Sequence, residues 1–128
     1  IKSAAVADYK PKTYSDKKIK KSNDDLIIEL DRNKDIAYEL GKIKKNKILV
    51  GFAAETNDLI ENAKNKVNKK NLDFIVANDL TQEGAGFGAD TNIVKIIDKE
   101  GNINKYPQMK KDEVANVILD KVKSLLDK

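Results

Sequence analysis

The stretch that decides the fold comprises residues 47–79, K-I-L-V-G-F-A-A-E-T-N-D-L-I-E-N-A-K-N-K-V-N-K-K-N-L-D-F-I-V-A-N-D. It contains two apolar runs separated by a segment with helical periodicity. The run Lys47–Ala54 is typical of a central buried strand, and Leu72–Ala77 indicates a second strand. Between them, residues 58–70 predict a helix with one apolar stripe, formed by Leu59, Ile60, Ala63 and Val67. A strand, a crossover helix and a second strand normally join parallel strands of one sheet. The stretch therefore predicts an α/β domain.

The segments on either side extend this pattern. The further expected elements are strands at 1–6 and 25–30, a helix at 35–43 with Asn33 as its N-cap, a hairpin of 92–97 and 103–106 around Gly101-Asn102, and a final helix at 111–126. Residues 10–23, rich in Lys, Ser and Asp, indicate a loop or flap. We expect a Rossmann-like three-layer α/β domain with a mostly parallel sheet and a C-terminal β-hairpin.

The chain is expected to form a single domain over residues 1–128. It begins inside a predicted strand and without Met, so we expect an upstream portion of the domain to be missing. The absence of a signal peptide and of any membrane-length apolar run makes a cytoplasmic location the expected one.

Composition excludes several kinds of chemistry. The sequence has no Cys and no His, which removes thiolate nucleophiles, disulfides and the commonest general base and metal ligand. Catalysis would have to use Lys, carboxylates, amides, backbone groups or a metal held by oxygen ligands. The net charge is +4, and the excess of lysine lies in residues 1–21. A phosphate-bearing ligand suits such a segment, although a solvated surface explains it equally simply.

Three groups of residues are candidates for an anion site. Lysine clusters at Lys17–Lys21, where a phosphate would relieve the repulsion between the ammonium groups. Lys66 and Lys70 lie one turn apart beside the apolar stripe of their helix, where they either bind phosphate oxygens or simply extend towards solvent. The small-residue stretches Ala4–Asp8 and Gly51–Thr56 would let a ligand approach the backbone at strand ends, or would merely accommodate packed helices. Each of the two stretches includes a carboxylate that could hold Mg²⁺ against a phosphate.

The Gly-rich segment 84–90 lacks the pattern of a phosphate-binding loop. A mobile turn over a site and a plain connector remain equally consistent with it. Asn78-Asp79, at the end of a predicted strand, is a better candidate for contacting a ligand.

Six motifs in order resemble one family, the phosphopantothenate–cysteine ligase part of the bacterial bifunctional coenzyme A biosynthesis protein. They are A-A-V-A-D-Y (4–9), K-I-K-K (18–21), N-K-D-I (33–36), V-G-F-A-A-E-T (50–56), K-N-L-D-F-I-V-A-N-D (70–79) and G-F-G-A-D-T-N (86–92). The resemblance implies a cytoplasmic, dimeric, Mg²⁺-assisted ligase. In that reaction 4′-phosphopantothenate attacks the α-phosphate of CTP, and the amine of cysteine then displaces CMP from the acyl-cytidylate.

The resemblance also implies roles for individual residues. Lys18 matches the flap lysine that acts on the activated intermediate, and Asp8 matches an aspartate associated with nucleotide and metal. The other implied nucleotide-contacting positions are Lys34, Asp35, Ile36, Ala37, Phe52, Lys66 and Lys70. Position 34 is Pro in many members and Lys here.

Two parts of the family pattern are not found in this sequence. The Gly/Ser-rich segment with the asparagine that handles the acyl-cytidylate belongs before residue 1. FMN belongs only to a decarboxylase domain that is often fused further upstream. We therefore expect this chain alone to be inactive as a ligase.

Three other functions compete with the ligase. The sequence pI of about 9.1 and the lysine cluster are compatible with a nucleic-acid-binding module, but the chain has a single arginine, Arg32, and few aromatic residues for stacking. A dinucleotide-dependent oxidoreductase would need a G-x-G-x-x-G motif after a strand, which is lacking. A regulatory domain without activity is the third. We expect small-molecule substrates and a homodimer, and neither nucleic acid nor membrane as a partner.

Overall fold

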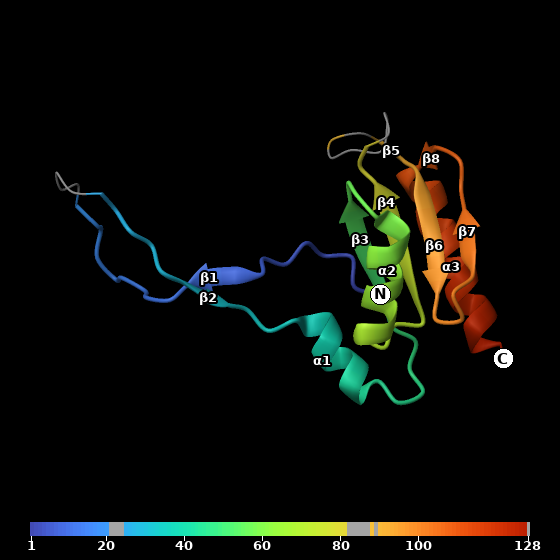
Figure 1. Ribbon diagram of the computed structural model, residues 1–128, viewed down its shortest axis with the longest axis horizontal. Coiled ribbons are helices and arrows are strands. Elements are labelled where there is room, and N and C mark those ends of the chain that lie inside the picture. The colour runs from blue at the N-terminus through green and yellow to red at the C-terminus, as the bar shows by residue number, and fades with distance from the viewer. Residues whose placement is uncertain (21–24, 82–87, 89, 128) are drawn as a thin grey trace.

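A computed structural model describes residues 1–20, 25–81, 88 and 90–127 of the chain. The elements in chain order are β1 (Tyr9–Pro11), β2 (Leu30–Arg32), α1 (Ile36–Ile43), β3 (Val50–Glu55), α2 (Leu59–Lys69), β4 (Phe74–Asp79), β5 (Thr91–Asn92), β6 (Val94–Asp98), β7 (Ile103–Lys105), β8 (Met109–Lys110) and α3 (Lys111–Leu126). Figure 1 shows a body built from β3 onward and a long arm, containing β1 and β2, that projects away from it. We call residues 9–32 the arm.

The main sheet is mixed. Its strand order is β3-β4-β6-β7, with β3 and β4 parallel and the other two pairs antiparallel. The prediction of a mostly parallel sheet was therefore wrong, and a Rossmann-like arrangement is not confirmed. The reason is that β6 pairs with β4 as an antiparallel neighbour, so only the pair β3–β4, which α2 connects, is parallel in this sheet. The predicted hairpin around Gly101-Asn102 is confirmed as β6–β7.

The strand β3 lies at the edge of this sheet, not at its centre. Its apolar sequence misled the prediction because an edge strand can still be covered on both faces. Val50 is fully buried on one face and Ala53 is buried on the other.

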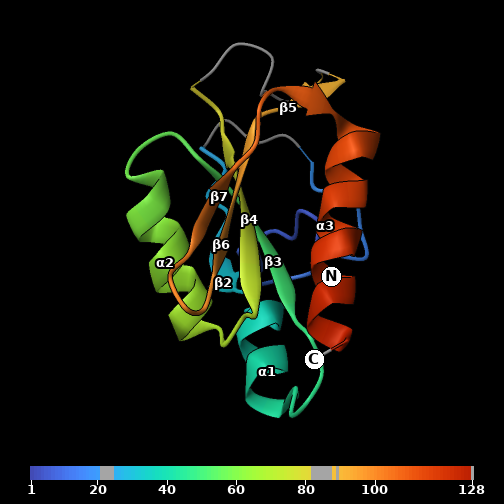
Figure 2. The same ribbon diagram turned by 90° about the vertical axis from the view of Figure 1, so that its right-hand side faces the viewer.

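Two helices cover opposite faces of the sheet (Figure 2). The core on the α2 side comprises Leu49, Ala53, Leu59, Ala63, Val67, Leu72, Ile75, Ala77 and Ile97. The core on the α3 side comprises Val50, Phe74, Val76, Val94, Ile96, Val114 and Ile118. The stripes expected on both helices are confirmed, since Leu59, Ala63 and Val67 are buried on α2 and Val114 and Ile118 on α3. Alternate residues of β4 and β6 face the two layers, as the period of a strand requires.

The segments that precede α1 correct three predictions. Residues 1–6 form no strand, although the Lys2 amide donates to the Val50 carbonyl at 2.9 Å. In the expected strand 25–30 only Leu30 belongs to β2, and Lys10 and Pro11 of the expected loop belong to β1. Apolar residues alone do not make a strand where no second layer covers them. Ile27, for example, is 85% exposed.

Helix α1 is attached to the end of α2 by a close backbone approach. A β-carbon at Gly41 would lie 2.0 Å from the Lys70 carbonyl oxygen, so only glycine fits this position. The side-chain amide of Asn71 also donates to the Gly41 carbonyl at 2.9 Å. Beyond α1, the Asp73 carboxylate accepts from Lys44 Nζ and from the Leu49 amide, both at 2.7 Å. These contacts fix α1 relative to the beginning of β4.

Candidate functional site

The predicted nucleotide residues Asp35 and Lys70 are in direct contact. One Asp35 oxygen accepts from the Tyr38 amide at 3.1 Å and caps α1, so Asn33 is not the N-cap. The other oxygen lies 2.9 Å from Lys70 Nζ, just beyond the last turn of α2. The tight packing at Gly41 holds the two helix ends together. Two segments that are 35 positions apart in sequence thereby meet at one point.

This meeting point lies at the opposite end of the sheet from the one that strand-end sites usually occupy. Lys70 precedes β4, so it lies near the beginning of the parallel strands, whereas ligands of open α/β sheets bind at their carboxyl ends. Lys70 therefore lies at the other end of the parallel strands from the end of β3, where it contacts the start of α1.

The surroundings of Asp35 favour its charged form. Burial by itself raises the pKa of this carboxyl, but the hydrogen bonds from Lys70 and from the Tyr38 amide, with the nearby charges of Lys70 and Lys2, lower the pKa below its usual value. The carboxylate is thus fixed as an anion at neutral pH. It can hold a lysine in place without sharing a proton with a ligand.

The lowered pKa of Asp35 predicts a loss of stability in acid. A group with a depressed folded-state pKa contributes stability above its unfolded pKa of about 4, and this contribution disappears as the pH falls through the folded pKa. Asp35→Asn keeps a residue that can cap α1 but removes the charge. Urea unfolding at pH 7 and at pH 3 should therefore show a smaller difference for Asp35→Asn than for the unmodified chain. Equal differences would contradict the assigned ion pair.

Asn33 connects the backbone at Asp8 to the segment that leads into Asp35, and Asp8 and Asp35 line the same hollow. The Asn33 amide donates to the Asp8 carbonyl at 2.8 Å, and its side-chain amide donates to the Ala7 carbonyl at 2.9 Å. A hollow of about 260 Å³ opens at this place, and its lining consists of Asp8, Tyr9, Arg32, Asn33 and Asp35. We call it the α1 hollow.

The α1 hollow fits the way Mg²⁺ is usually bound together with a nucleotide. Mg²⁺ takes one or two protein carboxylates, and phosphates and waters complete its shell. The hollow offers Asp8 and Asp35. In the described part of the chain, no group of three or more acidic side chains forms a complete metal cage. Asp35 is already held by Lys70, which leaves Asp8 as the better ligand.

The remaining helix positions lie near this hollow with different exposures. Lys34 and Ile36 are exposed on either side of Asp35, and Ala37 is buried. Lys66 is half-buried one turn before Lys70, and its carbonyl accepts from the Lys70 amide at 3.0 Å. Residues 34–37, Lys66 and Lys70 thus belong to one region at the junction of α1 and α2.

Phe52 lies in a different place. It lines a groove of about 430 Å³ on the α3 side of the sheet, together with Ala4, Ala5, Ala53 and Ala54. Both small-residue stretches singled out in the sequence therefore meet in this groove. Asn78 lines it as well. Because the α1 hollow and this groove share no lining residue, the structure does not join Phe52 to the Asp35–Lys70 contact.

Lys18 lies on the arm, which projects away from the body (Figure 1), and it does not line the α1 hollow of its own chain. The Ser15 hydroxyl donates to the Lys17 carbonyl at 2.8 Å and fixes the turn before Lys18. Lys21 and residues 84–87 and 89 lie outside the described residues, so the ends of the lysine cluster and most of the Gly-rich segment have no structural account.

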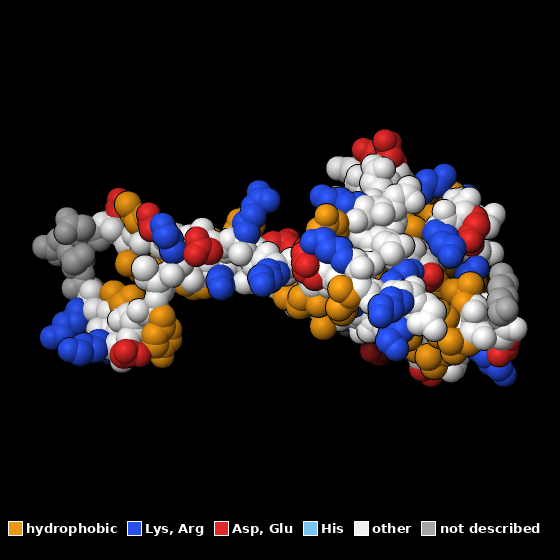
Figure 3. Space-filling view, turned by 90° about the horizontal axis from the view of Figure 1, so that it is seen from below, with side chains coloured by type: hydrophobic (Ala, Val, Ile, Leu, Met, Phe, Trp, Pro, Cys, Tyr) orange, Lys and Arg blue, Asp and Glu red, His pale blue; other side chains and the backbone are white. Residues whose placement is uncertain are grey.

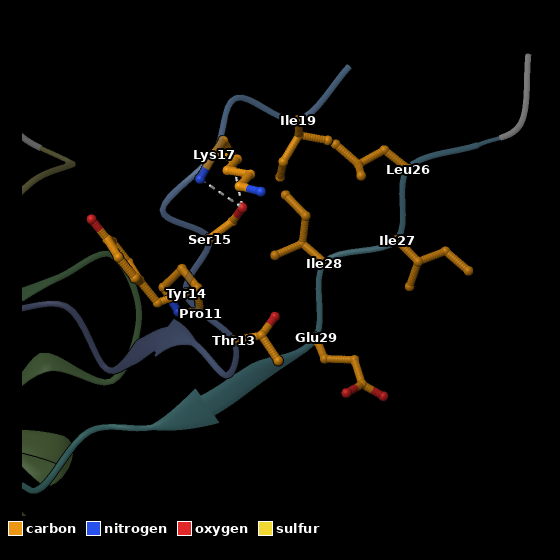
Figure 4. A pocket seen from close by; sticks show the side chains of 10 residues that line it. All are labelled: Pro11, Thr13, Tyr14, Ser15, Lys17, Ile19, Leu26, Ile27, Ile28 and Glu29. Atoms are coloured by element: carbon orange, nitrogen blue, oxygen red, sulfur yellow. Dashed lines mark hydrogen bonds between the residues drawn. The ribbon is translucent and has the colours of Figure 1, made fainter. Parts of the chain in front are cut away.

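A hollow of about 640 Å³ also lies on the arm. Ile19, Leu26 and Ile28 point towards one another across it, while Ile27 points away (Figure 4). All four are more than half exposed. Figure 3 shows hydrophobic side chains open to view along the arm. Its lining combines these apolar side chains with Lys17 and Glu29, and neither Asp8 nor Asp35 reaches it.

Sequence reasoning missed Arg32, Tyr9 and the clamping role of Asn33. Arg32 was noted only as the single arginine of the chain. The register between Tyr9 and Arg32 depends on β1–β2 pairing, which the sequence pattern did not predict. The signal that could have indicated this pairing is the short alternation of apolar and polar residues at Tyr9–Pro11 and at Leu30-Asp31.

The fold and the site together define an α/β domain with a hollow beside a helix start whose lining includes two carboxylates and one guanidinium. No described helix is long and apolar enough to cross a membrane. Residues 1–126 match the family model described as "DNA/pantothenate metabolism flavoprotein C-terminal domain". The chain belongs to this family.

Individual relatives agree with this assignment. The coenzyme A biosynthesis bifunctional protein CoaBC of Bacillus subtilis (strain 168) is 53% identical over 125 residues, which cover 98% of this chain and 31% of that protein. A cysteine/cysteine sulfinic acid decarboxylase of an unknown prokaryotic organism is 53% identical over 127 residues, covering 98% of this chain and 35% of that protein. The chain thus spans about a third of the length of these relatives.

A solved structure is also similar. The crystal structure of the C-terminal domain of a CoaBC protein superposes with a TM-score of 0.75 at 38% identity, covering 97% of this chain and 52% of that one. The family resemblance drawn from the six motifs is confirmed.

Proposed function

We propose that this chain is the nucleotide-binding part of a CTP-dependent phosphopantothenate–cysteine ligase. In the first step a carboxylate oxygen of 4′-phosphopantothenate forms a bond to the α-phosphorus of CTP. The bond between that phosphorus and the bridging oxygen breaks, and pyrophosphate leaves with the electron pair. In the second step the cysteine amine attacks the acyl carbon, CMP leaves with its oxygen, and the amine loses a proton.

The observation that carries this proposal is the contact between Asp35 and Lys70, 2.9 Å long. It joins the N-K-D-I motif to the helix lysines, the two segments for which the resemblance implies nucleotide contacts. A lysine held in place by a carboxylate loses little further conformational entropy when it binds a phosphate. The half-buried Lys66 adds a second cation from the same helix.

Asp8 is the proposed metal ligand. When bound there, Mg²⁺ supplies neutralisation of the triphosphate charge and lowers the electrostatic barrier to attack. The residues of this chain hold the site in position, because Asn33 fixes the backbone of Asp8 and Lys70 fixes Asp35, which lines the same hollow. The absence of His and Cys is compatible with this chemistry, which needs charge neutralisation and orientation.

A second copy of the chain is the proposed partner of the arm. Lys18 does not line the α1 hollow of its own chain, and the arm exposes Ile19, Leu26 and Ile28. An isolated two-stranded ribbon is at best marginally stable in water, so a covering surface is expected. In a homodimer the arm of one copy would be covered, and Lys18 would reach the activated intermediate in the site of the other.

Two proteins test the ligase proposal. The first is the 128-residue chain, which we expect to bind CTP in the presence of Mg²⁺ but to release no pyrophosphate. The second is a fusion in which the chain replaces the matching region of B. subtilis CoaBC. Pyrophosphate release that requires CTP, 4′-phosphopantothenate and cysteine is expected from the fusion.

The same experiment separates the rival functions. A folded fusion without turnover, next to an active parental enzyme, would contradict the ligase assignment for this chain. A salt-sensitive shift with an oligonucleotide, without any response to CTP, would support the nucleic-acid-binding alternative instead.

A further inference from the structure

The single arginine of the chain has an unusual setting. Arg32 ends β2 and faces Tyr9 of β1 across the antiparallel ladder. Its guanidinium carbon lies 5.8 Å from the centre of the Tyr9 ring, within the range of a cation–π contact. The ring therefore restrains a planar cation at the point where the arm joins the body.

The contacts of Arg32 leave its charge available. Within the residues that the structure describes, no ion pair ties the guanidinium to a carboxylate, although Asp8 and Asp35 line the same hollow. Asp35 is instead paired with Lys70. An arginine that is held by a ring and not by an acid keeps its hydrogen-bond donors for a ligand.

The backbone around Arg32 is fixed on both sides. Tyr9 pairs with Arg32 in register, and the next residue, Asn33, donates twice to the opposite segment, to the carbonyls of Asp8 and Ala7. These contacts hold the start of the Arg32 side chain at the wall of the α1 hollow. The wall thus carries two carboxylates suited to a hydrated Mg²⁺ and one guanidinium suited to phosphate oxygens.

We propose that Arg32 is a phosphate-binding residue of the α1 hollow, and that it contacts the part of the nucleotide that leaves as pyrophosphate. This inference rests on the ligase proposal and adds a residue to it. The planar fork of arginine donates to two phosphate oxygens at once, which a lysine does not do. As the bond at the α-phosphorus breaks, negative charge develops on the leaving pyrophosphate, and a guanidinium already in place stabilises it.

The test is calorimetric titration of the 128-residue chain with three ligands: pyrophosphate with Mg²⁺, CTP with Mg²⁺, and CMP. Arg32→Gln should weaken binding of pyrophosphate and of CTP about five- to tenfold and leave CMP unchanged. Arg32→Lys, which keeps the charge but loses the fork, should give an intermediate loss. Tyr9→Leu, which removes the supporting ring, should resemble Arg32→Lys.

Lys12→Gln is the matched control. Lys12 is a cation on the same arm, but it pairs with Glu29 at 3.3 Å and does not line the α1 hollow. Its replacement should change none of the three affinities. Circular dichroism and the urea midpoint of each variant report whether the chain still folds as before.

Each outcome decides a different claim. If the unmodified chain binds CTP and pyrophosphate and Arg32→Gln binds both equally well, the role of Arg32 is wrong while the ligase proposal stands. An equal loss for CMP in a variant that still folds would also overturn that role, since it would place the contact on the part of the nucleotide that CMP retains. If the unmodified chain binds neither CTP nor pyrophosphate, both proposals fail together.

Discussion

Replacing Gly41 by Ala is expected to destabilise the chain by about 1–3 kcal/mol, the usual range for overpacking a close contact. An alanine β-carbon at this position would lie 2.0 Å from the Lys70 carbonyl oxygen and 2.8 Å from its carbon, and both atoms belong to the backbone. Helix α1 would have to move away from the end of α2. Asp35 and Lys70 would then separate, and CTP affinity would fall with the stability.

The sign of this prediction makes it a strict test. In an exposed helix, exchanging Gly for Ala normally stabilises by up to about 1 kcal/mol, because alanine is the better helix former. Urea unfolding of Gly41→Ala should therefore show a lower midpoint, where helix propensity alone predicts a higher one. Lys42→Ala, on the exposed side of the same turn, is the control and should change the midpoint little. A stabilised Gly41→Ala would show that α1 does not pack on Lys70 as described.

Replacing Lys70 by Met should weaken CTP binding roughly 10- to 100-fold, which corresponds to the loss of a charge-assisted contact of about 1.5–3 kcal/mol. Methionine retains much of the length of the side chain and removes the ammonium group. The change also leaves Asp35 without its 2.9 Å partner, so the start of α1 loses part of its support. Calorimetric titration with CTP and Mg²⁺ measures the effect directly.

The neighbouring residue provides the control for Lys70. Lys69 carries the same side chain on the last turn of α2 but is exposed. Lys69→Met should bind CTP as the unmodified chain does, since it changes the net charge by the same amount without touching the site. Similar losses in the two variants would mean that the general charge of the surface, and not a specific contact, attracts the nucleotide.

The elements that could be predicted from the sequence are those with a periodic apolar pattern. Helix α3 was predicted over 111–126 and lies at Lys111–Leu126, because Val114 and Ile118 mark one buried face. The hairpin β6–β7 followed from Gly101, whose φ of 89° suits only a glycine at low cost. In both cases the local pattern and the final packing agree.

The elements that were mispredicted depend on partners elsewhere in the chain. The run at 25–30 has a strand-like composition, but it has no second layer to pack against. The order of the sheet was wrong for a related reason. The apolar sequence of β3 indicates that both of its faces are covered. It does not indicate whether β3 pairs with one strand or with two.

The site shows the same division. The resemblance of short motifs singled out Asp8, Asp35 and Lys70, and the structure places the first two in one hollow and the third in contact with Asp35. The contribution of Arg32 could not be read from the motifs, because it depends on which residue of β1 faces it. The position of Lys18 depends on the arm, whose conformation no local pattern determines.

The connectivity of the sheet has a consequence for the order of folding events. The strands β6 and β7 are joined by residues 99–102 alone, so their antiparallel pair closes a small loop, whereas pairing β3 with β4 spans the whole of α2. We therefore expect contacts of the body to form in the transition state, and the arm, whose described side chains are all exposed, to adopt its structure after the barrier. The segment that carries Lys18 is thus expected to order last.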